Sequence, residues 1–211
     1  RQPLVEMAIS AGENRKDAEK AFEKAVNKQK ECFNEMKILG RQALADLEKD
    51  PEKIGVVIFS RPYNGFVEEA HMGIPRKLAS RGVKVIPLDF IPVENSKARR
   101  HMYWGMGQVI LMAARVVKEH PQLFGTYITN FSCGPDSFIL GYFREIMGRK
   151  PSLTLELDSH TADAGLETRI EAFLDIVSAY RQLEQNKRII NIEEPYRPAK
   201  VNIDRGRVEV V

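Results

Sequence analysis

The chain has 211 residues, of which 43% are hydrophobic and 29% charged, a composition typical of ordinary folded proteins. Its formal net charge of +3 is small, and its basic residues are interleaved with acidic ones, so nucleic acid is not an expected partner. No apolar run reaches the about 18 residues that a membrane-spanning helix needs, and no secretory signal is visible. We therefore expect no membrane partner.

The two cysteines, Cys32 and Cys133, lie in segments of very different pattern. This argues against a disulfide and favours a reducing compartment, so we expect a cytoplasmic protein. The chain begins at Arg1 rather than Met, in the middle of a sequence pattern, and we expect it to be a fragment of a longer protein.

The first segment, residues 1–50, predicts a long helix. From Asn14 to Glu48 nearly every residue favours helix formation, and apolar residues recur at roughly a helical period. We expect this apolar stripe to pack on whatever follows. Gly40 either bends or splits the helix, and Asp50-Pro51 ends it.

Strand and helix patterns then alternate through residues 51–185. Short apolar runs predict buried parallel strands. In chain order the segments are strand Ile54–Phe59, helix Val67–Arg81 with an ordered part beginning near Ile74, strand Val83–Leu88, helix His101–His120, strand Phe124–Phe131, helix Asp136–Gly148, strand Leu153–Leu157 and helix Ala164–Gln185. Such alternation indicates βαβ units with right-handed crossovers. We predict an α/β, flavodoxin-like three-layer sandwich with a mainly parallel sheet of four strands or slightly more.

The last segment, residues 186–211, contains Pro195, Pro198 and two short apolar pieces. It fits an edge hairpin, a tail bound to a partner, or disorder. We favour an extended tail.

The loops that follow parallel strands share one edge of the sheet, where ligands bind. Here they are rich in Pro, Gly, Asp, Asn and His. Turns and helix caps explain any one such loop, but four together indicate a site. Arg61 is the best candidate for binding an anion. The candidate pocket residues are Arg61, Tyr63, Asn64, Asp136, Asp158 and His160.

Cys133 lies in the loop between the third strand and the next helix, near a helix N-terminus that favours a thiolate. A nucleophile would need a base, which His160 or His71 could supply. An iron–sulfur ligand would need further thiolates, and Cys32 lies on another element. A small residue in a tight turn is the third alternative.

Residues Met102 to Gly107 place two glycines beside the only tryptophan, Trp104. Glycines here would allow a ligand or another backbone to approach closely. The alternative, which we favour, is that Tyr103 and Trp104 close the core.

Four short segments together resemble one known family: Arg61–Asn64, His71–Pro75, Asn130–Ser137 and Glu156–Arg169. They are similar to the dehydratase-like part of the large acyl-CoA dehydratase activase-related proteins, also called CoA-substrate-specific enzyme activases. That part is in turn similar to subunits of 2-hydroxyacyl-CoA dehydratases and benzoyl-CoA reductases. The resemblance covers about Ile54 to Val177 and leaves the N-terminal helix and the tail outside.

The resemblance implies a [4Fe–4S] cluster held between flavodoxin-like domains by cysteines from more than one domain. Cys133 matches a ligand position, and the other ligands would precede Arg1, so we expect this chain alone to lack the cluster and to be inactive. The resemblance also implies electron transfer to an acyl-CoA thioester and an ATP-hydrolysing module fused upstream. No P-loop or comparable motif assigns ATP to this chain.

Our leading hypothesis is therefore a part of an ATP-driven iron–sulfur electron-transfer protein of anaerobic metabolism, acting on an acyl-CoA-type substrate. Its expected partners are other domains of the parent chain, with a homo-oligomer as a further arrangement. Two alternatives stay open. One is a non-catalytic docking domain that assembles through the N-terminal helix and the tail, and the other is an enzyme that uses Cys133 as nucleophile with His160.

Overall fold

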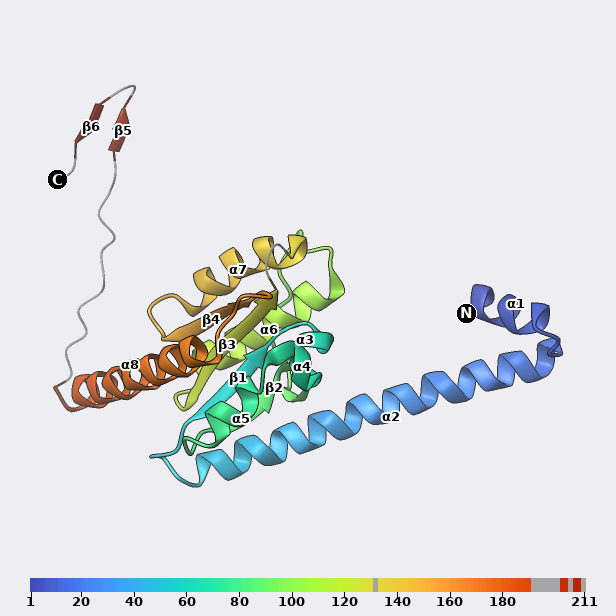
Figure 1. Cartoon of the computed structure of the whole chain (residues 1–211), viewed down its shortest axis with the longest axis horizontal. Coiled ribbons are helices and arrows are strands. Elements are labelled where there is room, and N and C mark those ends of the chain that lie inside the picture. Colours follow the sequence, from blue (N-terminus) through green and yellow to red (C-terminus); the bar gives the residue numbers. More distant parts are fainter. Residues whose placement is uncertain (131–132, 191–201, 205–206, 210–211) are drawn as a thin grey trace.

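A computed structural model describes residues 1–130, 133–190, 202–204 and 207–209 of the chain. Figure 1 shows a central sheet covered by helices, with one long helix that runs past it. The elements are α1 (Gln2–Ser10), α2 (Arg15–Glu48), β1 (Gly55–Phe59), α3 (Pro62–Phe66), α4 (Glu68–His71), α5 (Ile74–Ala79), β2 (Lys84–Pro87), the 3-10 helix η1 (Leu88–Phe90), α6 (Gly105–Glu119), β3 (Leu123–Asn130), α7 (Gly134–Met147), β4 (Ser152–Leu157), α8 (Asp163–Ile190), β5 (Asn202–Asp204) and β6 (Arg207–Glu209).

The first four strands form one parallel sheet in the order β2-β1-β3-β4. All five residues of β1 are buried, as expected for a parallel strand whose two faces are both covered. The order is that of a flavodoxin-like doubly wound sheet with one strand fewer. The predicted fold class is confirmed.

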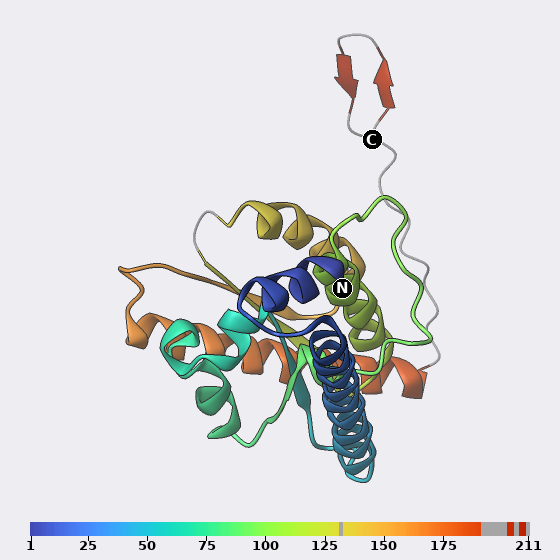
Figure 2. The same ribbon diagram turned by 90° about the vertical axis from the view of Figure 1, so that its right-hand side faces the viewer.

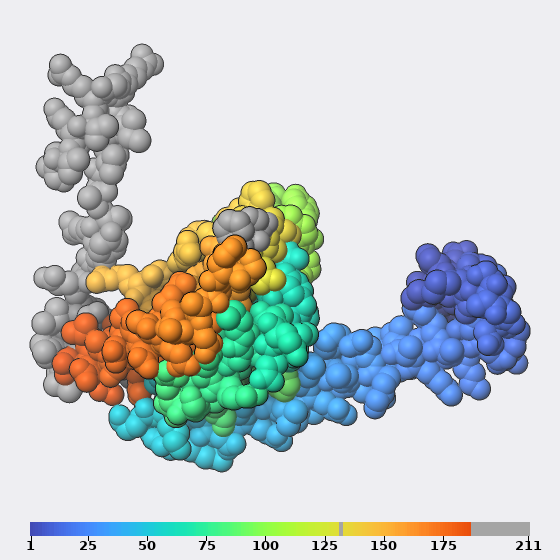
Figure 3. Space-filling view, in the orientation of Figure 1, coloured from blue at the N-terminus to red at the C-terminus, as the bar shows by residue number. Residues whose placement is uncertain are grey.

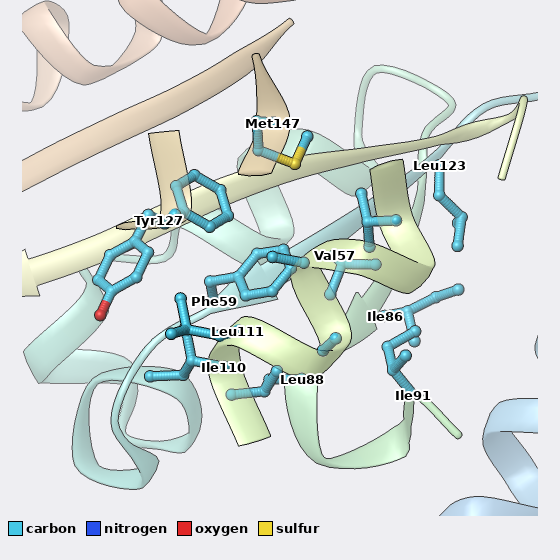
Figure 4. Close-up of a cluster of buried hydrophobic side chains, with 14 of the residues drawn as sticks. Val57, Phe59, Ile86, Leu88, Ile91, Ile110, Leu111, Leu123, Tyr127 and Met147 are labelled. Carbon is cyan, nitrogen blue, oxygen red and sulfur yellow. The ribbon is translucent and has the colours of Figure 1, made fainter. Parts of the chain in front are cut away.

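Side chains of β1 alternate between two hydrophobic clusters, one on each face of the sheet. Val57 and Phe59 join residues of α2, α6 and α7, whereas Val56 and Ile58 join residues of α5 and α8. Figure 2 shows these helices around the sheet, and Figure 4 shows the first cluster in detail. The two clusters make the three-layer sandwich and hold the strand ends in place.

The long helix α2 begins and ends close to its predicted limits. The side chain of Asn14 caps it, accepting a hydrogen bond from the backbone N–H of Asp17 at 2.9 Å. Gly40 neither splits nor ends it. A Cβ at Gly40 would lie 1.7 Å from the carbonyl oxygen of Phe90, so the glycine lets α2 approach η1 closely.

Only the last part of α2, from Gly40 on, packs on the α/β body. Leu47 is 1% exposed there, with Ala43 and Leu44 against the same cluster. Figure 3 shows the N-terminal part of α2, together with α1, projecting away from the α/β body. The prediction that the whole apolar stripe packs is therefore wrong for the residues before Gly40: Phe33 is 50% exposed and Leu39 53%.

The observed elements differ from the predicted ones in three further places. The helices α1 and α3 were not predicted. The helix predicted from Val67 is interrupted at Met72 and Gly73, which both have positive φ, so α5 begins at Ile74 as expected. Helix α6 begins at Gly105 rather than His101, because the side-chain amide of Gln108 donates to the backbone carbonyls of Arg99 at 2.6 Å and Met102 at 2.8 Å and holds this stretch as a loop.

The C-terminal segment is described in part. Helix α8 continues to Ile190, past the predicted end, and β5 pairs with β6 in a two-stranded antiparallel sheet. Residues 202–204 and 207–209 thus form a hairpin, but it is a separate two-stranded sheet and not an edge of the parallel sheet. The remainder of the predicted extended tail, residues 191–201, 205–206 and 210–211, lies outside the described residues. Among the described helices, none is long and apolar enough to cross a bilayer.

Candidate functional site

The candidate site lies where the chain changes direction within the sheet. Strand β2 lies on one side of β1 and β3 on the other, with Phe59 paired with Tyr127 near their carboxyl ends. Ligands of open parallel sheets bind at such a switch point. Arg61 precedes α3 after β1, and Cys133 precedes α7 after β3, each as the N-cap residue of its helix.

A buried carboxylate, that of Asp136 on α7, joins the two loops. It is 1% exposed, and its oxygens accept hydrogen bonds from the hydroxyls of Thr129 at 2.6 Å and Tyr127 at 3.1 Å. The Nε of Arg61 lies 3.6 Å from the same carboxylate. Burying a charge is costly unless it is paired and hydrogen-bonded, so this network fixes Asp136 and draws Arg61 over the end of the sheet.

Tyr127 links the network to the hydrophobic core. Its ring packs with Phe143 at 5.3 Å between centroids, and Figure 4 shows its hydroxyl pointing away from the apolar cluster. Burial first, and then the negative charge of Asp136, raise the pKa of Tyr127 well above its usual range. Tyr127 is therefore a fixed hydrogen-bond donor to Asp136.

Cys133 is a partly buried free thiol beside Tyr63. Its backbone carbonyl accepts hydrogen bonds from the N–H of Ser137 at 3.1 Å and from the Ser137 hydroxyl at 3.0 Å, which fixes the start of α7. Burial first, and then the neighbouring Cys133, raise the pKa of Tyr63. The phenol of Tyr63 thus remains protonated next to the thiol.

A cavity of about 600 Å³ opens beside Arg61, between the start of α3, the start of α6 and α7. Its size is in the range of small-molecule sites. The residues that line it are Arg61, Pro62, Tyr63, Tyr103, Trp104, Gly105, Met106, Gly107, Ile110, Pro135 and Ile139.

The aromatic residues before α6 do not close the core, so that prediction is wrong. Tyr103 is 88% exposed and Trp104 46%, whereas Met102 is buried in their place. The ring of Trp104 lies 6.0 Å from that of Phe138 on α7. Gly107 is needed for Met102 rather than for a ligand, because a Cβ there would lie 2.7 Å from the Met102 sulfur.

Asn64 on α3 is fully buried, and its side-chain amide has no hydrogen-bond partner within the described part of the chain. Such orphaned groups are rare in folded proteins and mark sites of water, strain or ligand contact. His71, buried at the end of α4, also has an unpartnered ring nitrogen, Nδ1. His71 is 8% exposed and packs in the body of the fold.

Asp158 and His160 were predicted to share the pocket, but their described contacts stay within the turn after β4. An oxygen of Asp158 accepts from the backbone N–H of His160 at 2.8 Å and from the Thr161 hydroxyl at 2.9 Å. These hydrogen bonds lower the pKa of Asp158. Across the described residues, no recorded hydrogen bond or ion pair joins His160 or His71 to Cys133.

The donor groups at this edge differ from the set that holds a complete [4Fe–4S] cluster. Such clusters take several thiolates, and the described residues contain no group of three or more His, Cys, Asp or Glu side chains able to hold a metal. Cys32 lies far along the chain on α2. The two cysteines of the sequence, Cys32 and Cys133, are fewer than the thiolates that a four-cysteine cluster takes.

Sequence reasoning missed several residues that shape the site. Tyr127 and Thr129 lie two positions apart on β3 and so share a face of the strand, and polar groups on a buried strand need partners. That spacing was the available signal. For the cavity wall, the signal was the run of aromatic residues Tyr103 and Trp104 beside two glycines.

Comparison with family models finds that residues 1–91 match the CoA enzyme activase uncharacterised domain. This confirms the resemblance to activase-related proteins and extends it to the N-terminal helices, which the sequence analysis left outside. The match includes Arg61, Tyr63 and Asn64 and ends before Cys133. Comparisons with curated proteins and with solved structures return no match.

Proposed function

We propose, from the match of residues 1–91 to a CoA enzyme activase domain, that this chain is part of an ATP-driven iron–sulfur electron-transfer protein. In this proposal Cys133 supplies one thiolate to a [4Fe–4S] cluster, and the cavity beside Arg61 is part of the pocket for an acyl-CoA-type substrate. The observation that carries it is the convergence of a free thiol, an oriented arginine and a cavity at one switch point of the sheet.

The remaining thiolates come from another domain of the parent protein or from a second chain. When bound, the cluster would supply single electrons at this edge. The chain's own contribution is positional: the Cys133 backbone is fixed by Ser137 at the start of α7, and Asp136 holds Arg61 beside the cavity. ATP belongs to a module outside these residues.

Iron binding tests the thiolate role, in the undivided parent protein because the cluster is shared. The protein is reconstituted with iron and sulfide without oxygen, and iron and sulfide per chain are measured. Cys133→Ser should lose most of the iron, whereas Cys32→Ser, the other free cysteine, should retain it. Equal iron in the two variants, or none in the unmodified protein, would overturn the proposal.

A docking domain is the second candidate, and the projecting arm favours it. We define the arm as α1 and the part of α2 before Gly40, residues 15–39. It carries exposed apolar side chains, with Leu4 55% and Met7 62% exposed on α1 and Phe33 50% exposed on α2. A cavity of about 540 Å³ between α1 and α2 is lined by Leu4, Ala8, Glu13, Asp17, Ala18, Ala21, Phe22 and Ala25. Exposed apolar surface of this kind is typical of interaction sites.

A further inference from the structure

We infer that the cavity beside Arg61 binds an organic anion, with the charged group at the guanidinium and an apolar or aromatic body against the cavity wall. This inference rests on the proposed function, since it names the ligand class of the same edge of the sheet. The inference is tested on iron-free protein, so the inference and the proposed function can fail separately.

Arg61 is the only charged residue among the eleven that line the cavity. The other lining residues are aromatic, aliphatic, proline, glycine or methionine. A pocket with apolar walls and one charged group at its end orients an amphipathic ligand in a single direction. The charge of Arg61 is positive, so the complementary group on the ligand is an anion.

Arg61 is held so that part of its guanidinium remains free. Its Nε faces Asp136 at 3.6 Å, and both oxygens of that carboxylate also accept hydrogen bonds, from Tyr127 and Thr129. Asp136 is the one ionic partner recorded for Arg61 within the described residues. A guanidinium has several N–H donors in a planar fork that fits carboxylate and phosphate. The outer part of the fork is available to a ligand in the cavity.

The aromatic wall is exposed and held in place before any ligand binds. The side chains of Tyr63 and Trp104 are 42% and 46% exposed. The loop that leads to Trp104 is held by the side-chain amide of Gln108, which hydrogen-bonds to the backbone of Arg99 and of Met102. Exposed aromatic rings on a fixed loop lower the entropic cost of binding a flat apolar group.

Trp104 provides a direct measurement, because it is the only tryptophan of the chain. The iron-free chain is titrated with phenylacetate, with phenyl phosphate, and with phenylacetamide as the uncharged counterpart of the first, while Trp104 fluorescence is recorded. At least one anion should change the fluorescence saturably and bind about tenfold or more tightly than the amide, as expected for a charge-assisted hydrogen bond. The two anions separate carboxylate from phosphate recognition.

Arg61→Gln should remove the preference for the anion over the amide, and Arg76→Gln should keep it. Arg76 is a matched control because its side chain is 77% exposed and pairs with Glu68, away from the cavity. Equal affinity of the unmodified chain for anions and amide would overturn the inference, and so would no binding of any probe. These two outcomes need no variant, so they stand even if Arg61→Gln does not fold. A preference that Arg61→Gln retains would also overturn it.

Discussion

Asp136 determines much of the geometry of the candidate site, because its carboxylate is the common partner of Tyr127, Thr129 and Arg61. Removal of any one of these partners leaves the buried carboxylate less well satisfied and destabilises the fold. The positions of Arg61 and of the start of α7 therefore both depend on donors that come from β3. Two threonines of this strand allow that dependence to be measured.

Thr129→Val removes a hydroxyl that donates to Asp136 at 2.6 Å and should destabilise the fold by about 1–3 kcal/mol. Thr126→Val is the matched control on the same strand, because the Thr126 hydroxyl is fully buried without a hydrogen-bond partner among the described residues. Its replacement should be neutral or stabilising. Urea denaturation of the three proteins measures both effects. A smaller loss for Thr129→Val than for Thr126→Val would contradict the assigned network.

Lys150 predicts a specific pH dependence of stability. It is 5% exposed, and its Nζ donates to the backbone carbonyls of His120 and, at 2.7 Å, Val117. Burial first, and then the charge of Lys118, lower the pKa of Lys150 to about 8, from 10.5 when unperturbed. Between these values the unfolded chain binds more protons than the folded one, so the free energy of unfolding should rise with pH.

Comparison with Lys150→Met isolates this effect. The unfolding free energy of the unmodified protein, minus that of the variant, should be constant below the folded-state pKa. It should then increase through the interval up to the unfolded-state value, by on the order of 3 kcal/mol. Denaturant midpoints across this range give the difference. A difference that falls or stays constant with rising pH would exclude the assigned pKa shift.

At the scale of elements, the glycines within helices are of two kinds. Some allow another backbone to approach the helix closely, and others lie where a larger side chain would fit. Gly40→Ala would place a Cβ 1.7 Å from the Phe90 carbonyl oxygen and must push α2 away from η1. Gly141 on α7 has nothing within 4 Å of an added Cβ. Gly40→Ala should therefore lower the melting temperature, and Gly141→Ala should raise stability by up to about 1 kcal/mol. Thermal unfolding that ranks the two variants in the reverse order would refute the packing of α2 on η1.

The sheet was predictable because β1 is an apolar run and β4 alternates apolar with polar residues, and the parallel order follows from the alternation of strands with helices. Short helices such as α3 were not, because tertiary contacts rather than local preference determine them. Within the site, the convergence of Arg61, Tyr63 and Cys133 follows from strand ends sharing an edge. The recorded hydrogen bonds of Asp158 stay within its own turn, to His160 and Thr161.

At the scale of the whole molecule, the projecting arm in Figure 3 is the feature that the fold of the α/β body does not explain. A helix whose apolar residues meet solvent gains most of its stability only when a partner covers them. The family match includes this arm together with β1 and β2. We therefore expect the arm to make contacts between chains or between domains.

Replacement of Leu4 and Met7 together by Glu tests this role, since the two side chains lie on one face of α1. If the arm joins two copies, light scattering should report an oligomer for the unmodified chain and a monomer for this variant. Ile176→Glu is the control, because Ile176 is 58% exposed on α8, outside the arm. A monomeric unmodified chain, or an oligomer that survives the arm substitutions, would argue against self-assembly through α1.

The central claim is that the sulfur of Cys133 ligates iron, and the electron paramagnetic resonance spectrum of the reduced, reconstituted parent protein tests it most directly. Oxygen in place of a ligating sulfur alters the electronic structure of a cluster, because ligand type tunes the iron. We predict that the spectrum is lost or shifted in Cys133→Ser and is unchanged in Cys32→Ser. An unchanged spectrum in Cys133→Ser would contradict the account.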